Sequence, residues 1–150
     1  YKICIYMKTL IVISVLFLAT ISVYSQQTIM IKDSGFADIS VLVKKTGFGD
    51  ISVLFKDSGF GDISIGFTNN PAEADMILKH TGFADRSVLL EKTGFADISI
   101  LLKDSGFADV TILIKKSGNV DYYIYSDRKN LSKNEIIAAL IEVIKSKANK

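Results

Sequence analysis

The chain has 150 residues, of which 49% are hydrophobic and 23% are charged, a composition typical of one folded domain and unlike that of a disordered chain. The formal net charge of +2 falls to zero without Lys2 and Lys8, because 16 basic and 16 acidic residues then remain. This balance argues against nucleic acid as a partner, since binding phosphates requires a concentrated basic surface.

Residues 1–25 have the pattern of a secretory signal peptide. Lys8 precedes an apolar run that begins at Leu10, and small residues end the segment at Ser25. We expect cleavage before Gln26 and a secreted or periplasmic mature protein, with Met7 as the true start. A retained anchor is the alternative, but about 15 apolar residues are fewer than the roughly 20 that span a bilayer. The only cysteine, Cys4, precedes the cleavage site, so the mature chain has no disulfides.

Residues 26–126 form a domain of tandem repeats. Glycines recur every twelve residues, and the unit reads K-[D/K]-[S/T]-G-F-[A/G]-D-I-[S/T]-V-L-V. The middle copy, residues 68–78, has eleven residues, with one residue added to its turn and two lost from its strand. Because two residues are lost, the alternation of strand faces is preserved.

Each unit predicts one strand followed by one turn. Ile39, Val41 and Val43 alternate with Ser40 and Leu42, and the Gly of the next segment permits a tight turn. The fold class is therefore mainly β, with eight strand–turn repeats. We favour a β-solenoid-like stack, because the charges at the second position largely alternate and would attract between stacked repeats. An antiparallel meander that closes into a barrel or sandwich is the alternative.

The seventh position of the unit is Asp in every copy. Stacked carboxylates repel one another unless each accepts backbone N–H bonds or pairs with a Lys. We expect a structural role in the turns. Repeated acidic turns can also bind Ca²⁺, although the period of twelve departs from the nonapeptide calcium repeat. The weak metal candidates are Asp38, Asp50, Asp62, Asp97 and Asp109.

Residues 127–150 form a C-terminal helix and tail. Ser132 and Glu135 have capping-box spacing, and Ile137, Leu140 and Ile144 lie on one helical face. We predict a helix from about residue 133 to residue 147 that caps the last repeat.

A column of leucines lies on the outward strand face. These residues are uncovered in a single-layer stack, so we expect the helix to cover part of the column and a second copy or an envelope protein to cover the rest. The possible interface residues are Leu42, Leu54, Leu89, Leu101 and Leu113.

Three other groups are best explained as structural. The repeated phenylalanines, beginning with Phe36, are expected in the core, and a cluster from Tyr122 to Tyr125 is expected to cover the last repeat. His80, the only histidine, supplies by itself neither a metal cluster nor a catalytic triad, so we expect an exposed turn residue.

The x-A-D motif before each strand, the variant TNNPAEAD and the final VDYYIYSD before a helix resemble bacterial secreted repeat proteins grouped as domains of unknown function. The resemblance implies an envelope or extracellular setting and transfers no activity or site residue.

The repeats argue against catalysis. Carboxylate catalysis needs two acids in unlike environments, whereas a repeat places every Asp in nearly the same one. We therefore expect no catalytic residues and no cofactor, and a non-enzymatic structural or binding module of the cell envelope. The alternatives are a calcium-stabilised extracellular module and a carbohydrate-active enzyme with an unrecognised site.

Overall fold

The computed structural model describes residues 25–150, so the predicted signal peptide up to residue 24 lies outside the described residues. Within this range the chain forms nine strands, one short 3-10 helix (η1, Pro71–Glu73) and one α-helix (α2, Lys133–Ala148). The strands are β1 (Gln27–Lys32), β2 (Ile39–Lys44), β3 (Ile51–Lys56), β4 (Ile63–Phe67), β5 (Met76–Lys79), β6 (Arg86–Glu91), β7 (Ile98–Lys103), β8 (Val110–Ile114) and β9 (Tyr122–Ser126).

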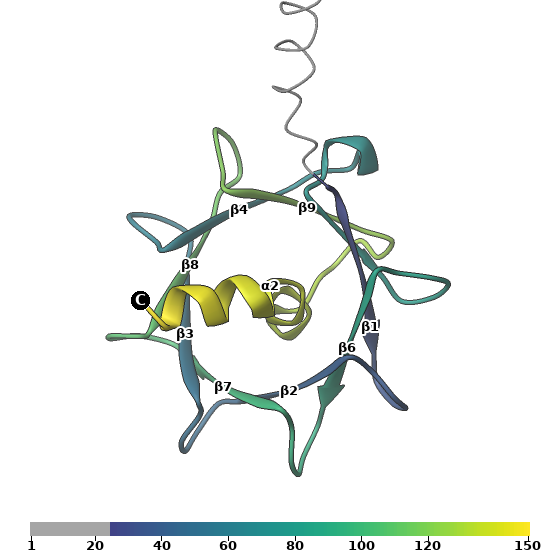
Figure 1. The fold of residues 1–150 in the computed structure, drawn as a ribbon. Helices are drawn as coiled ribbons and strands as arrows, with labels where there is room; N and C mark the ends of the chain where they lie inside the picture. The colour runs from purple at the N-terminus through teal and green to yellow at the C-terminus, as the bar shows by residue number, and fades with distance from the viewer. Residues whose placement is uncertain (1–24) are drawn as a thin grey trace, which may run out of the picture.

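All nine strands of the described range pair in parallel and close into a barrel, which Figure 1 shows as a ring. The order around the barrel is β1-β5-β9-β4-β8-β3-β7-β2-β6. The solenoid prediction required strands that all run in one direction, and the structure has them. The alternative required a sheet that closes into a barrel, and the structure has this as well. The antiparallel pairing of that alternative is wrong, and hydrogen-bonded neighbours are strands four or five apart along the chain rather than successive repeats.

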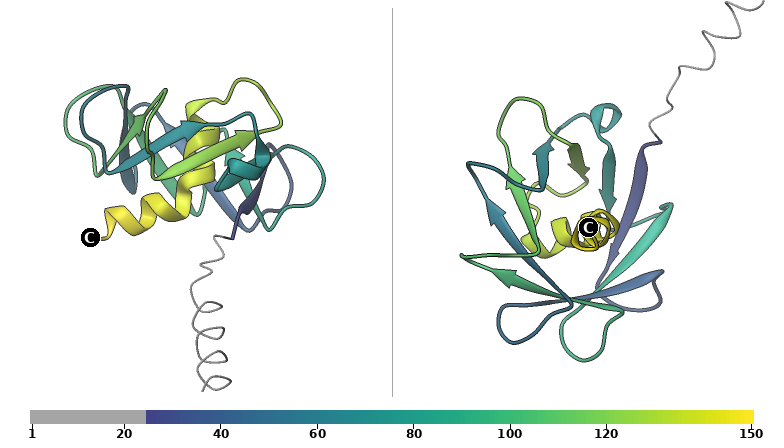
Figure 2. Two further views of the ribbon diagram at one scale, coloured as in Figure 1. Left: turned by 90° about the horizontal axis from the view of Figure 1, so that it is seen from above. Right: turned by 60° about the vertical axis from the view of Figure 1, so that its left-hand side comes forward.

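The chain travels around the barrel twice. In the first lap, β1 to β5, successive strands leave a gap between them, and the strands of the second lap, β6 to β9, fill these gaps. Each connecting loop must therefore cross the strand that lies between the two strands it joins, and it does so on the outside of the barrel (Figures 1 and 2). The crossing is close at Gly49 in the β2–β3 loop, where a Cβ would lie 2.7 Å from the backbone N of Leu101 in β7. The two laps are interlocked, because loops of each lap enclose strands of the other.

The inward face of the barrel and the helix share one core. The inward residues of the strands, such as Val41 and Ile100, are fully buried together with Ile137, Leu140 and Ile144 of α2. Figures 1 and 2 show α2 inside the ring, with its C-terminal part turning across one mouth. The predicted helix and its Ser132–Glu135 capping box are confirmed. Its expected role as a cap on the last repeat is wrong, because it fills the barrel.

The shortened middle repeat keeps its strand faces in phase with the others. Met76 and Leu78 lie in the inner core, while Ile77 is buried outside that core cluster. The prediction that losing two residues preserves the alternation is therefore confirmed.

The outward leucines are covered by the crossing loops. Leu42, Leu54 and Leu113 are only 6%, 5% and 6% exposed, and Leu89 and Leu101 are half-buried. The second-lap loops cross β2 and β3, and the first-lap loop that carries Gly61 lies against Leu113. The expectation that α2 covers this column is wrong, because α2 lies on the other face of the sheet. An interface through Leu42, Leu54 and Leu113 would require these loops to move.

Candidate functional site

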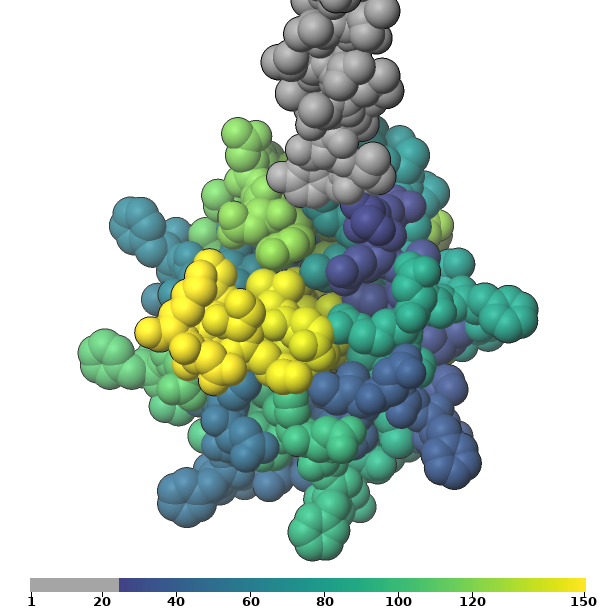
Figure 3. All heavy atoms as spheres, in the orientation of Figure 1, coloured from purple at the N-terminus to yellow at the C-terminus, as the bar shows by residue number. Residues whose placement is uncertain are grey.

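Six phenylalanine side chains point away from the barrel into solvent. Each is at least 95% exposed, and they form the spikes around the molecule in Figure 3. We call them the phenylalanine knobs: Phe36, Phe48, Phe60, Phe83, Phe95 and Phe107. Their predicted place in the core is wrong, because the fifth position of the repeat lies in a loop that crosses outside the sheet.

The loops hold the knobs in one repeated conformation. In every knob loop the Gly before the Phe has a φ between 84° and 95°, a region that other residues rarely adopt. In four of these loops the last Lys of the preceding strand donates a hydrogen bond to the carbonyl oxygen of the Phe, as Lys32 does to Phe36 at 2.6 Å. All six rings are therefore carried on loops with the same glycine turn, and in four of the loops a side-chain hydrogen bond also holds the backbone of the Phe.

The β8–β9 loop shows that this conformation does not need a phenylalanine. Gly118 has a φ of 88°, and Lys115 donates to the carbonyl oxygen of Asn119 at 3.0 Å, as in the knob loops. Asn119 occupies the position that Phe has elsewhere. Because the loop folds with Asn at this position, folding of the loop does not explain the six phenylalanines.

The aspartates at the seventh position of the repeat unit form hydrogen bonds between the two laps. Asp97 Oδ2 accepts hydrogen bonds from the backbone N–H of Ser40 at 2.6 Å and from its hydroxyl at 2.8 Å. The Asp97 N–H in turn donates to Ser40 Oγ at 2.9 Å. Related Asp–Ser/Thr contacts join Asp38 to Ser87, Asp50 to Ser99, Asp62 to Thr111, Asp85 to Thr28, Asp109 to Ser52 and Asp121 to Ser64.

These contacts stabilise the ionised carboxylates. Hydrogen bonds from the partner Ser or Thr, through its backbone N–H and its hydroxyl, lower the pKa of Asp38, Asp50, Asp85, Asp97, Asp109 and Asp121 below the ordinary value of 3.8. Each of these carboxylates accepts a backbone N–H bond, as a structural role requires, but the donor lies on a neighbouring strand rather than in the turn of the Asp itself. Within residues 25–150, no three His, Cys, Asp or Glu residues are arranged as a metal-binding group, and the five metal candidates are therefore not part of one.

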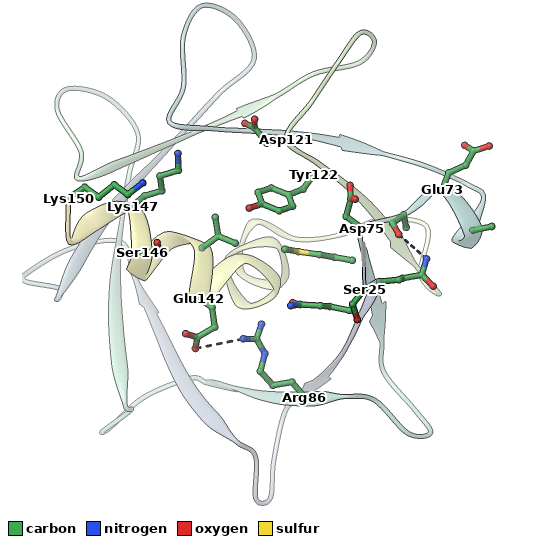
Figure 4. Close-up of a pocket in the computed structure, with 16 residues that line it drawn as sticks. Ser25, Glu73, Asp75, Arg86, Asp121, Tyr122, Glu142, Ser146, Lys147 and Lys150 are labelled. Carbon is green, nitrogen blue, oxygen red and sulfur yellow. Dashed lines mark hydrogen bonds and ion pairs between the residues drawn. The ribbon is translucent and has the colours of Figure 1, made fainter. Parts of the chain in front are cut away.

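A cavity of about 810 Å³ lies at the barrel mouth where the strands begin (Figure 4). Arg86 and Glu142 form an ion pair across it at 3.7 Å, and Asp75, Asp121 and Lys147 also line it. Asp75 and Asp121 already accept hydrogen bonds from the backbone N–H groups of Tyr123 and Ser64. The cavity thus carries charges of both signs. Several of these charged groups already form hydrogen bonds to the strands or an ion pair with α2. The sequence signal for it was Arg86, which stands where the repeat has Ile or Val.

His80 is not an exposed turn residue, which corrects the expectation from the sequence. Its side chain is only 7% exposed, with Nδ1 at 2.6 Å from Asp127 Oδ1 and Nε2 at 2.8 Å from Glu135 Oε1. His80 follows β5, whereas both carboxylates belong to the C-terminal segment. The cluster therefore fastens the start of α2 to the barrel wall.

The tyrosines of β9 are divided between the two faces of the sheet. Tyr122 packs against the core, whereas Tyr123 is 37% exposed and donates to the carbonyl oxygen of Gly118.

No helix in the described part of the chain is long and apolar enough to cross a membrane. No protein-family model and no curated protein matches the chain, so the site is interpreted from its own geometry.

Proposed function

We propose that this protein is a non-enzymatic binding module of the cell envelope, which works by presenting the phenylalanine knobs on a rigid barrel. The observation that carries the proposal is six aromatic side chains, each at least 95% exposed, on loops that do not need them in order to fold. Leaving a large apolar side chain in water forgoes the free energy of burial, so a repeated group of them marks an interaction surface.

The environments of the carboxylates support a binding role over an enzymatic one. The repeated aspartates share one kind of partner, and in six of them these hydrogen bonds move the pKa in the same direction, downward. General acid–base catalysis by two carboxylates requires the opposite, a pair whose pKa values are pushed apart. The same hydrogen bonds stabilise the turns without a cation, which favours the binding module over the calcium-stabilised alternative.

The proposal is tested by binding to envelopes isolated from the native host. The purified chain and a variant with all six knobs changed to Ser are mixed with the envelopes, and the sedimented fraction of each is measured. We expect the original chain to sediment and the variant to remain in solution. Equal sedimentation of the two would refute a role for the knobs, and turnover of a glycan panel by the chain would refute the non-enzymatic assignment.

A further inference from the structure

We infer that the phenylalanine knobs bind a second copy of this chain, with a knob of one copy entering a groove between neighbouring loops of the other. The inference rests on the proposed function, because it names the partner of the same surface. Three features carry it: a groove beside a knob, the charge of the chain and the placement of the knobs around the barrel.

The acceptor is a groove of about 440 Å³ between the β2–β3 loop and the β7–β8 loop. Half-buried Leu101 lies in it, and Lys45 and Asp104 are among the residues that line it. The groove is wide and open to solvent, so a phenyl ring can lie against Leu101 with its other face uncovered. Its lining combines apolar contact for a ring with charges of both signs around it.

The groove adjoins a knob. Gly47 lines the groove, and Phe48 is the next residue in the chain. When a projection and its acceptor are adjacent on one surface, two copies related by a two-fold axis can exchange them, so that each knob enters the other copy's groove. The knob and groove thus supply a self-complementary contact.

The charges of the chain favour a copy of itself over a strongly charged partner. The 16 basic and 16 acidic residues that remain without Lys2 and Lys8 leave no net charge to repel a second copy. The knob loops also differ in sign: the β2–β3 loop begins with Lys45, whereas the β1–β2 loop begins with Asp33. An anionic membrane or a nucleic acid would be selected by a uniformly basic surface, which these loops do not provide.

The placement of the knobs argues against a partner with one flat surface. They project in different directions around the molecule (Figure 3), so one flat surface contacts only neighbouring knobs. Each buried Phe contributes about 150–250 Å², so two knobs fall below the roughly 800 Å² per partner of a stable interface. Each knob-and-groove contact between two copies is therefore weak, and we expect association only at high protein concentration.

Sedimentation equilibrium of the purified chain tests the inference over a range of concentrations. We expect the average mass of the original chain to rise with concentration, and the variant with all six knobs changed to Ser to stay monomeric. Both proteins carry the same N-terminal residues, so a difference between them comes from the knobs. Thermal unfolding followed by circular dichroism should coincide for the two, because the knobs are outside the core.

A second variant tests the groove while keeping every knob. Changing Thr46→Arg together with Ser105→Arg fills the groove with two bulky cations at exposed positions. We expect the association constant to fall at least about tenfold, the loss that follows from excluding one buried aromatic ring. The matched control is Ser117→Arg with Asn119→Arg, which adds the same charges to the β8–β9 loop, where there is no knob, and should leave association unchanged.

The outcomes separate the inference from the proposed function. If the original chain is monomeric at every concentration, the inference is overturned, whereas knob-dependent sedimentation with envelopes still supports the binding module. If the chain self-associates and the groove variant does so equally well, this acceptor is refuted. If flotation with neutral phosphatidylcholine vesicles depends on the knobs while the chain stays monomeric, a lipid surface replaces the second copy as the partner.

Discussion

His80 Nε2 lies 2.8 Å from Glu135 Oε1, which joins the end of β5 to the first turn of the helix that fills the barrel. Glu135 also accepts hydrogen bonds from the backbone N–H and the hydroxyl of Ser132, so one carboxylate serves both the capping box and the attachment to the wall. Burial raises the pKa of Glu135, but the hydrogen bonds from Ser132 and His80 and the charge of His80 outweigh this effect, and the pKa lies below 4.5.

The change His80→Ala should therefore weaken the attachment of the helix. It removes the contacts of a nearly buried imidazole with the carboxylates of Asp127 and Glu135, and we expect the free energy of unfolding to fall by about 2 kcal/mol. Chemical denaturation followed by circular dichroism measures the change. Lys92→Ala is the control, because Lys92 occupies the same position of the repeat on an exposed loop. Equal stability of the two variants would contradict the role assigned to His80.

The aspartates that join the laps should make the barrel sensitive to acid. Their folded-state pKa values lie below the unfolded value of 3.8, so they contribute stability that is fully present above that value. This stability is lost as the pH falls through the folded pKa values. We expect the melting temperature to stay nearly level from pH 7 to about pH 5 and to fall steeply below about pH 4. Thermal unfolding at a series of pH values checks this, and a level profile down to pH 2 would exclude the linkage.

The effect on stability of removing one such aspartate can be compared with that of removing an aspartate that does not join the laps. The change Asp97→Ala leaves the backbone N–H and hydroxyl of Ser40 without their acceptor at the junction of the laps. We expect it to lower the melting temperature by several degrees. Asp104→Ala, on the exposed β7–β8 loop, should change it little. If Ca²⁺ at millimolar concentration raised the melting temperature of the original chain but not of Asp97→Ala, the aspartates would bind an ion instead.

The sequence predicts local structure well here because each unit contains its own strand and turn signals. The period of twelve, the inward face from Ile39 to Val43 and the Ser132–Glu135 capping box are all visible in a few adjacent residues. The pairing of strands is not visible, because nearly identical repeats offer the same pattern to every possible neighbour. The exposure of the knobs was not predicted either, because the alternation of inward and outward residues ends where the strand ends. It therefore does not show whether Phe36 faces the core or the solvent.

Departures from the repeat were the signal for the contacts of the helix. Arg86 replaces Ile or Val at the eighth position, and its guanidinium pairs with Glu142. His80 replaces Asp or Lys at the second position and contacts Glu135. A non-repeated helix contacts only part of the ring, so the repeats that it touches must differ from the others. Glu135 and Glu142 could not be named as partners from sequence, because each lies more than fifty residues away along the chain.

The interlocked laps should make folding slow. Paired strands are separated by 49 or 57 residues at their Asp–Ser/Thr contacts, and nonlocal contacts of this kind slow folding because the intervening chain loses entropy before they form. Strands of the second lap must also come to lie beneath loops of the first lap, which requires an end of the chain to be threaded. We expect refolding from denaturant to take longer than the milliseconds to seconds of ordinary β domains.

Two variants separate threading from other slow steps. Pro71→Ala removes the only proline, and the slow phase should persist in it, because threading does not depend on proline isomerisation. A folded domain fused after Lys150 should slow refolding further, since α2 runs from one mouth of the barrel to the other and the fused domain cannot pass through a closed ring. The rate is measured by the recovery of circular dichroism after dilution. Fast refolding of the fusion protein would show that the barrel closes around a helix already in place and that the C-terminal end is not the one that threads.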